Sequence, residues 1–172
     1  MSTRDLTAGA LATALVAAAT LAIRIPVPAT QGYINLGETL IYLTALLLGP
    51  VHGLVAGGVG SALADLLGGY AQFAPFTLVI KGVEGWLAGY LFWRVLRGSE
   101  AAGAVWAARA VVACAVAGAW MVAGYYLSEA FLLGLGPQAA ATEVPGNVFQ
   151  VLSGVVVGLA GSSVLRGVVA PR

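Results

Sequence analysis

Long apolar stretches, separated by short links that contain Gly and Pro, make up most of the chain. An α-helix needs about 20 apolar residues to cross the hydrocarbon core of a bilayer. The pattern predicts six helical segments, at residues 6–25, 38–48, 51–67, 76–96, 105–127 and 147–169. The second is too short to cross alone, but the set as a whole indicates an all-α membrane protein built as a bundle of six helices.

The links between the segments carry turn signals. The link "PVPATQGYINLG" follows the first segment, Gly49-Pro50 separates the second from the third, and "GLGPQAAATEVPG" precedes the last. A secretory signal peptide is an alternative for the first segment, because Arg4 stands before the run "LATALVAAATLA". The apolar run continues to Ile25 and further spans follow, which favours an uncleaved first helix.

Composition supports the membrane interpretation. Of the 172 residues, 60% are hydrophobic and 9% are charged, and the mean hydropathy is +0.94. A soluble domain is about 25% charged, so this surface could not all face water, and we expect one integral membrane domain. The net charge of +1 gives no indication of nucleic-acid binding. The single cysteine, Cys114, excludes an internal disulfide and indicates a packed apolar side chain.

Basic residues predict the orientation, because they favour the cytoplasmic ends of membrane helices. Six segments bring both termini to one side, and Arg24 is the only basic residue in a short link on the other side. The side with the termini receives Arg4, His52, Arg94, Arg97, Arg109, Arg166 and Arg172. Both termini are therefore expected in the cytoplasm.

Small residues recur at every fourth position of several segments, a spacing that lets helix backbones approach closely in lipid. They are Ala10, Ala14, Ala18 and Ala22 in the first segment, Gly49, Gly53, Gly57 and Ser61 in the third, Gly85 and Gly89 in the fourth, and Gly154, Gly158 and Ser162 in the sixth. Such stripes can simply pack helices within the chain. The alanine stripe is the best candidate for a face presented to another protein, because its helix is otherwise nearly featureless.

Three charged residues, Asp65, Lys81 and Glu84, lie among apolar residues toward the outer side of the predicted bundle. Lys81 and Glu84 are three residues apart and share one helix face. An unpaired ion at this depth is costly, so pairing or a water-filled cavity is expected. Two interpretations stay open: a structural ion-pair cluster that joins two helices, or a polar pocket, open to the outside, that meets a ligand.

Other polar and aromatic residues are expected at the same depth. They are Asn35, Tyr125, Glu129, Asn147 and Gln150. Aromatic residues are also common at membrane interfaces, and Asn147 is equally suited to capping the sixth helix. The sequence has no G-x-x-x-x-G-K-[ST] loop and no H-E-x-x-H motif, and His52 is its only histidine. No enzymatic activity, cofactor, metal site or energy source within this chain is therefore expected.

Several short motifs between Asn35 and Gly89 resemble those of one known family. They are "NLGE", "LLLGPVHG", the pair Ala64-Asp65, "APFT" and "KGVEG". This stretch is similar to the S component, the substrate-binding membrane subunit, of energy-coupling factor (ECF) transporters. The similarity is to the riboflavin-type branch, which also includes predicted carriers of hydroxymethylpyrimidine and pyridoxine.

The resemblance implies a six-helix subunit of a prokaryotic cell membrane that binds a small water-soluble vitamin or precursor at the outer face. Riboflavin, a pyridoxine-like compound or hydroxymethylpyrimidine would each suit a site with aromatic and hydrogen-bonding groups. The resemblance also implies docking through Ala10, Ala14 and Ala18 onto a transmembrane coupling protein, which two cytoplasmic ATPase subunits drive. The link "PVPATQGYINLG" would then be the gate over the pocket.

The resemblance and the polar pattern together predict the site. We expect the ligand to meet Lys81 and Glu84, then Asn147, Glu129 and Tyr125, with Asn35 and Gln150 beside them, and we expect Asp65 to pair with Lys81. Two alternatives come from other functional classes. One is an ion-coupled carrier or channel in which the charged residues relay protons or cations, and the other is an assembly subunit without a ligand.

Overall fold

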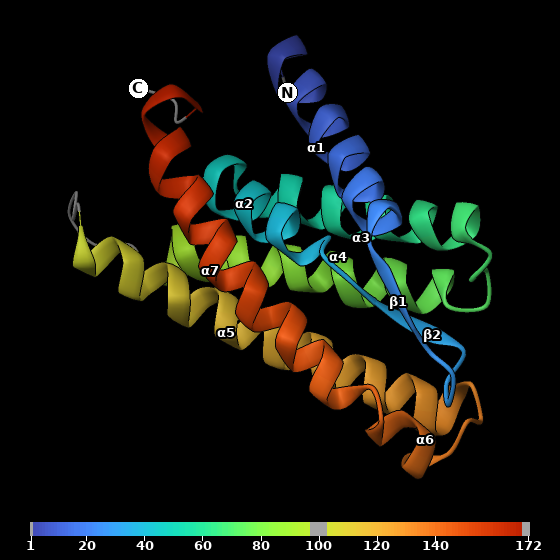
Figure 1. Cartoon of the computed structure of the whole chain (residues 1–172). Helices are drawn as coiled ribbons and strands as arrows, with labels where there is room; N and C mark the ends of the chain where they lie inside the picture. The colour runs from blue at the N-terminus through green and yellow to red at the C-terminus, as the bar shows by residue number, and fades with distance from the viewer. Residues whose placement is uncertain (1, 97–102, 170–172) are drawn as a thin grey trace.

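Helices carry most of the chain in the computed structural model, which describes residues 2–96 and 103–169 (Figure 1). In chain order the elements are α1 (Thr3–Ala22), β1 (Arg24–Val27), β2 (Gly32–Asn35), α2 (Glu38–Leu48), α3 (Pro50–Gly68), α4 (Ala74–Tyr90), η1 (Leu91–Val95), α5 (Ala104–Leu127), η2 (Ser128–Leu132), α6 (Pro137–Ala141) and α7 (Val144–Val169). The turns η1 and η2 are π-helical and continue α4 and α5. In the described part, six helices of eleven residues or more form the bundle.

Local sequence explains where several helices begin and end. The Ser2 side chain accepts a hydrogen bond from the Asp5 backbone, and the Asp5 carboxylate accepts one from the Ser2 backbone, which together cap α1. Pro50 stands in the first turn of α3, where a missing N–H costs nothing. Gly49 and Gly69 take φ angles of 90° and 88°, which glycine adopts without strain, at the two ends of α3.

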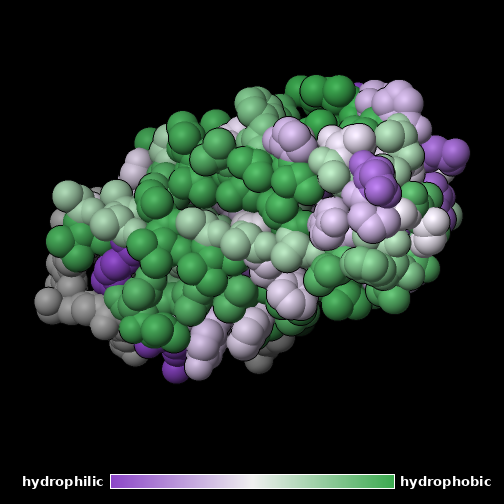
Figure 2. Space-filling view, turned by 90° about the horizontal axis from the view of Figure 1, so that it is seen from below, coloured by the Kyte–Doolittle hydropathy of each residue, from purple (hydrophilic) through white to green (hydrophobic). Residues whose placement is uncertain are grey.

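The outer surface is that of a membrane protein. Four described helical stretches are long and apolar enough to cross a bilayer, at Thr3–Ala22, Pro50–Gly68, Ala104–Leu132 and Pro137–Leu165, whereas α2 is shorter. Figure 2 shows one face covered mainly by apolar side chains, with hydrophilic residues gathered toward its ends. Exposure of such an apolar area to water would be unfavourable, whereas in a membrane these side chains contact the hydrocarbon core of the bilayer.

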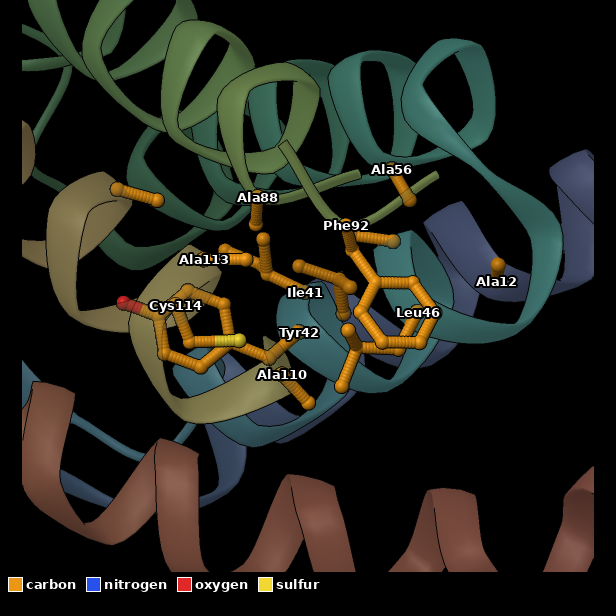
Figure 3. Packing of buried hydrophobic residues seen from close by; sticks show 13 residues of the cluster. Ala12, Ile41, Tyr42, Leu46, Ala56, Ala88, Phe92, Ala110, Ala113 and Cys114 are labelled. Carbon is orange, nitrogen blue, oxygen red and sulfur yellow. The ribbon is translucent and has the colours of Figure 1, made fainter. Parts of the chain in front are cut away.

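The hydrophobic core surrounds α2. Ile41, Tyr42 and Leu46 of α2 are at most 2% exposed and pack toward α4 and α5 (Figure 3). Cys114 of α5 is buried beside Tyr42, in the packing role that the sequence indicated. Because α2 lies in the interior, its short length does not prevent it from belonging to a membrane domain.

Two links contain structure that the apolar pattern did not predict. The first, which was expected to be only a loop, forms a two-stranded antiparallel hairpin in which Arg24 pairs with Asn35 and Val27 with Gly32. The last link contains α6. The hairpin and α6 lie together at one end of the molecule in Figure 1, and the start of α1 and the end of α7 lie away from them.

The basic residues used for the orientation follow the same division where the structure describes them. Arg4, His52 and Arg94 line one recess at the start of α1 and α3. Arg24 stands at the hairpin, where its guanidinium donates to the Gly68 carbonyl at 3.1 Å. Arg97 and Arg172 lie outside the described residues, and the Arg166 side chain is also outside the description.

Candidate functional site

A polar cavity of about 30 Å³ lies between the hairpin and the helices. Its lining residues are Thr20, Gly32, Tyr33, Asn35, Ser61, Asp65, Phe73, Thr77, Lys81, Tyr125, Glu129, Glu143, Asn147 and Gln150. They come from α1, the hairpin, α3, α4, α5, η2, α7 and the residues next to these elements. A volume of this size holds a few water molecules at most, so a vitamin-sized ligand requires the hairpin or side chains to move.

The cavity brings together most of the residues that the sequence singled out for binding. Lys81, Tyr125, Glu129, Asn147, Gln150 and Asn35 all line it, as does Asp65. These residues are separated by up to 115 positions in the sequence, so only the fold makes them neighbours. Glu84 is the exception, because it is not part of the lining.

Lys81 is the buried cation of the site. Its ammonium group forms ion pairs with Glu38, at the start of α2, and with Glu84, at 3.4 Å. The expected pairing with Asp65 is wrong: within ion-pair distance, the described partners of Lys81 are these two glutamates. The physical reason is the rotation of α4, which turns Lys81 toward the first turn of α2.

Asp65 instead belongs to the contact between α3 and the hairpin. Its carboxylate accepts a hydrogen bond of 2.6 Å from the Tyr33 hydroxyl. Burial, together with the nearby Asp65 charge, raises the pKa of the Tyr33 phenol, so the phenol stays protonated and remains a donor at neutral pH. Tyr33 also lies against the Tyr70 ring, with 4.4 Å between the ring centroids.

Glu84 lies behind the cavity wall. Its side chain is fully buried and accepts a hydrogen bond of 2.8 Å from the Tyr42 hydroxyl, inside the core around α2. The prediction that Lys81 and Glu84 lie on one face of the helix is confirmed, because the two side chains form an ion pair three residues apart. Their side chains reach different surroundings, and only Lys81 reaches the cavity.

Two further contacts fasten the hairpin over the cavity. The backbone N–H of Asn35 donates to the Gln150 side chain of α7, and the Thr30 hydroxyl donates to the Glu143 carboxylate. Together with the Tyr33–Asp65 bond, these contacts tie the hairpin to α3 and to the start of α7. The hairpin therefore covers the cavity with polar contacts that can be exchanged for others, whereas an apolar seal would have to expose its buried area to open.

The amide pair on α7 contributes both donors and acceptors to the lining. The Gln150 amide donates to the Asn147 side-chain oxygen at 3.0 Å. Because α7 begins at Val144, three residues earlier than expected, Asn147 lies in the first turn and is not the N-cap. Of the two roles considered for Asn147, the structure therefore supports the lining position.

Glu129 occupies an unusual position in the lining. It belongs to the π-helical turn η2, and such turns occur often at functional sites. Its side chain is 1% exposed, no described N–H or hydroxyl group donates to either carboxylate oxygen, and the Glu143 carboxyl group lies beside it. One helical turn earlier, the Tyr125 ring lies 5.7 Å from the Lys81 ammonium, and its hydroxyl donates to Thr77.

Several lining residues were missed by the sequence reasoning. They are Thr20, Gly32, Tyr33, Ser61, Phe73, Thr77 and Glu143. Tyr33 and Glu143 stand in the polar links at the outer end, so their position was a usable signal. Thr20 and Ser61 look like ordinary small residues within apolar helices, and nothing in the sequence distinguishes them. Among the described residues, no group of His, Cys, Asp and Glu is arranged to hold a metal ion.

The chain is similar in sequence to membrane transport proteins. A family model described as "ECF-type riboflavin transporter, S component" matches residues 1–166. A protein of Pyrococcus woesei, named "Uncharacterized protein in gap 3'region", is 42% identical over 145 residues, which are 81% of this chain and 86% of that protein. The "Thiamine precursor transporter HmpT" of Lactococcus lactis subsp. cremoris (strain MG1363) is 29% identical over 132 residues, 76% of this chain and 69% of that transporter.

Proposed function

Because the chain belongs to the family of ECF-type riboflavin transporter S components, we propose that it captures a vitamin or vitamin precursor at the outer face and delivers it inward with an ATPase-driven coupling module. Membership makes the chain the substrate-binding S component of an ECF vitamin transporter, a multi-pass membrane protein of a prokaryotic family and not an enzyme. This confirms the class that the short motifs indicated. Beyond membership, we propose which class of compound is bound, that it enters from the outer face, and that a coupling protein and two ATPase subunits are the partners.

The observation that carries the proposal is the polar cavity beneath the hairpin. It combines aromatic rings, amides and carboxylates, the groups that orient a small polar ring compound in a ligand site. The cavity lies at the end opposite Arg4, His52 and Arg94, so the positive-inside rule supports an outward-facing cavity and cytoplasmic termini.

Ligand entry requires the hairpin to release its contacts. The bonds of Thr30, Tyr33 and Asn35 to the bundle hold the hairpin down, and the cavity beneath is too small for a vitamin while they persist. We expect the ligand to take over some of these polar partners. Riboflavin, a pyridoxine-like compound and hydroxymethylpyrimidine remain the candidates, and the name of the Lactococcus relative supports a thiamine precursor among them.

The exposed face of α1 supports docking onto a coupling protein. Ala10, Ala14 and Ala18 are exposed, whereas Ala12 and Val16, on the other face, are buried. A flat stripe of small residues permits close approach of another membrane helix. Energy for uptake would come through this contact from the two ATPase subunits.

Uptake in a vitamin-auxotrophic host lacking its own carriers tests the proposal. We expect uptake only when the chain is co-expressed with a coupling protein and its ATPases, and we expect the purified chain to bind the transported vitamin in calorimetry. A proton gradient that drives uptake without any ATPase would instead establish the ion-coupled carrier. A purified, folded chain that binds no vitamin would support an assembly subunit.

A further inference from the structure

The cavity has an excess of acidic groups. Asp65, Glu129 and Glu143 line it together with a single cation, Lys81. Lys81 does not balance these acids, because Glu38 and Glu84 already share its charge from behind the wall. Arg24 lies outside the lining and donates to the Gly68 carbonyl. The site is therefore poorly suited to an anionic ligand, and its carboxylate oxygens can accept further hydrogen bonds from a ligand that carries donors.

Glu129 is the acceptor with the most unused capacity. A carboxylate can accept about four hydrogen bonds, and neither Glu129 oxygen has a described donor although the side chain is 1% exposed. Glu143 lies close beside it, so no neighbouring positive charge explains the position of Glu129. Two carboxyl groups buried side by side repel each other when both are ionised, and a bound cation or paired donor would remove that cost.

The other lining residues indicate the chemical groups that such a ligand should carry. Tyr33, Phe73 and Tyr125 offer aromatic surfaces, and the Asn147–Gln150 pair offers further polar contacts. A ring that stacks on an aromatic side chain can turn an amino edge toward a carboxylate. A ring nitrogen next to an exocyclic amine, once protonated, gives the two parallel N–H donors that a carboxylate binds best.

We propose that Glu129, with Glu143 beside it, binds the amino edge of a basic nitrogen heterocycle, so that the transported compound is an amino-substituted ring and not a flavin. This inference rests on the proposed function and narrows its ligand class. A single ring also demands less opening of the cavity than three fused rings do.

Calorimetry on the purified wild-type chain tests the ligand class with three probes. They are hydroxymethylpyrimidine with its ring amino group, the same pyrimidine with hydrogen in place of that group, and riboflavin. A charge-assisted bond to a buried carboxylate predicts that the amino compound binds about tenfold to a hundredfold more tightly than its deaminated analogue. Riboflavin is expected to bind more weakly than the amino compound.

The variant Glu129→Gln tests the residue. Glutamine keeps the size but removes the charge and presents an N–H₂ group to the ligand's own donors, so the preference for the amino compound should fall by about tenfold or more. Without ligand, the variant should melt at the same or a higher temperature, because the repulsion between the two acidic groups is removed and the glutamine amide can donate to Glu143. Asp5→Asn, which removes a carboxylate in the first turn of α1, is the control and should bind like the wild type.

The outcomes separate the ligand class from the general function. Tightest binding of riboflavin, equal binding of the two pyrimidines, or an unchanged preference in Glu129→Gln would overturn the inference and leave the vitamin transporter intact. Absence of binding by every probe, together with no vitamin co-purifying with the chain, would overturn both.

Discussion

Lys81 shows how a single buried cation organises this protein. It is 2% exposed and lies between Glu38 of α2 and Glu84 of α4, which are fully buried, so two helices contribute to one ionic group. Desolvation of these charges is costly, and their mutual attraction compensates for it only while all partners are present. The residue thus fixes α2 against α4 directly behind the cavity.

Lys81→Met is expected to destabilise the chain by about 3–5 kcal/mol, because it leaves two carboxylates buried without a cation. The free energy of unfolding, measured by denaturant titration in mixed detergent micelles, checks this. Adding Glu38→Gln and Glu84→Gln to the same variant should recover most of the loss, since no charge is then left unpaired. A single variant as stable as the wild type would show that Lys81 does not neutralise the cluster.

At the scale of elements, α3 and α4 pack backbone to backbone. A methyl group at Gly53 would overlap the Gly85 carbonyl, and one at Gly85 would overlap the Gly53 carbonyl. Gly154 and Gly158 of α7 likewise lie against α2, beside Glu38 and Tyr42. The small-residue stripes of these helices are therefore internal contacts, which lets the helices that carry Asp65, Lys81 and Gln150 converge on the cavity.

Gly85→Ala is expected to cost about 1–3 kcal/mol of unfolding free energy, because the added methyl group forces two helix backbones apart. Gly82→Ala, one turn earlier on α4, is the matched control: the nearest atom to its methyl group would be the Leu54 carbonyl oxygen at 3.4 Å. That control should be neutral or slightly stabilising, since alanine is the better helix former. Equal effects of the two substitutions would contradict backbone contact at Gly85.

Across the whole molecule, the polar cavity, the basic residues and the apolar surface occupy different regions. The cavity and hairpin occupy one end, basic residues gather at the other, and apolar side chains dominate the face shown in Figure 2. The alanine stripe of α1 differs from the glycine stripes because it is exposed instead of packed within the chain. Ligand capture and coupling are therefore expected to depend on separate surfaces.

Replacing Ala14 and Ala18 together with Trp should reduce ATPase-dependent uptake to background, because the bulky rings block approach of the coupling protein. Ligand affinity of the purified variant should change by less than about twofold, as expected for surface substitutions away from the site. Ala160→Trp, on the exposed side of α7, is the control and should transport normally. Normal uptake by the double variant would exclude α1 as the docking face.

Much of the site was predictable because depth along a helix follows from residue count. Lys81, Tyr125, Glu129, Asn147 and Gln150 were placed at one level from their positions in the helices, and they do line one cavity. Rotation about the helix axis does not follow from residue count. For that reason Asp65 was paired with Lys81 incorrectly, and Glu84 was placed in the lining although it points into the core.

The sequence by itself determined the membrane class, the order of the helices and the level of their polar groups, because apolar length and residue spacing are local properties. Only the tertiary structure decided that Glu38 neutralises Lys81, that the first link pairs as a hairpin, and that η2 presents Glu129 to the cavity. Each of these depends on contacts between segments distant in the chain, where helix rotation and the packing of small residues select one neighbour among several.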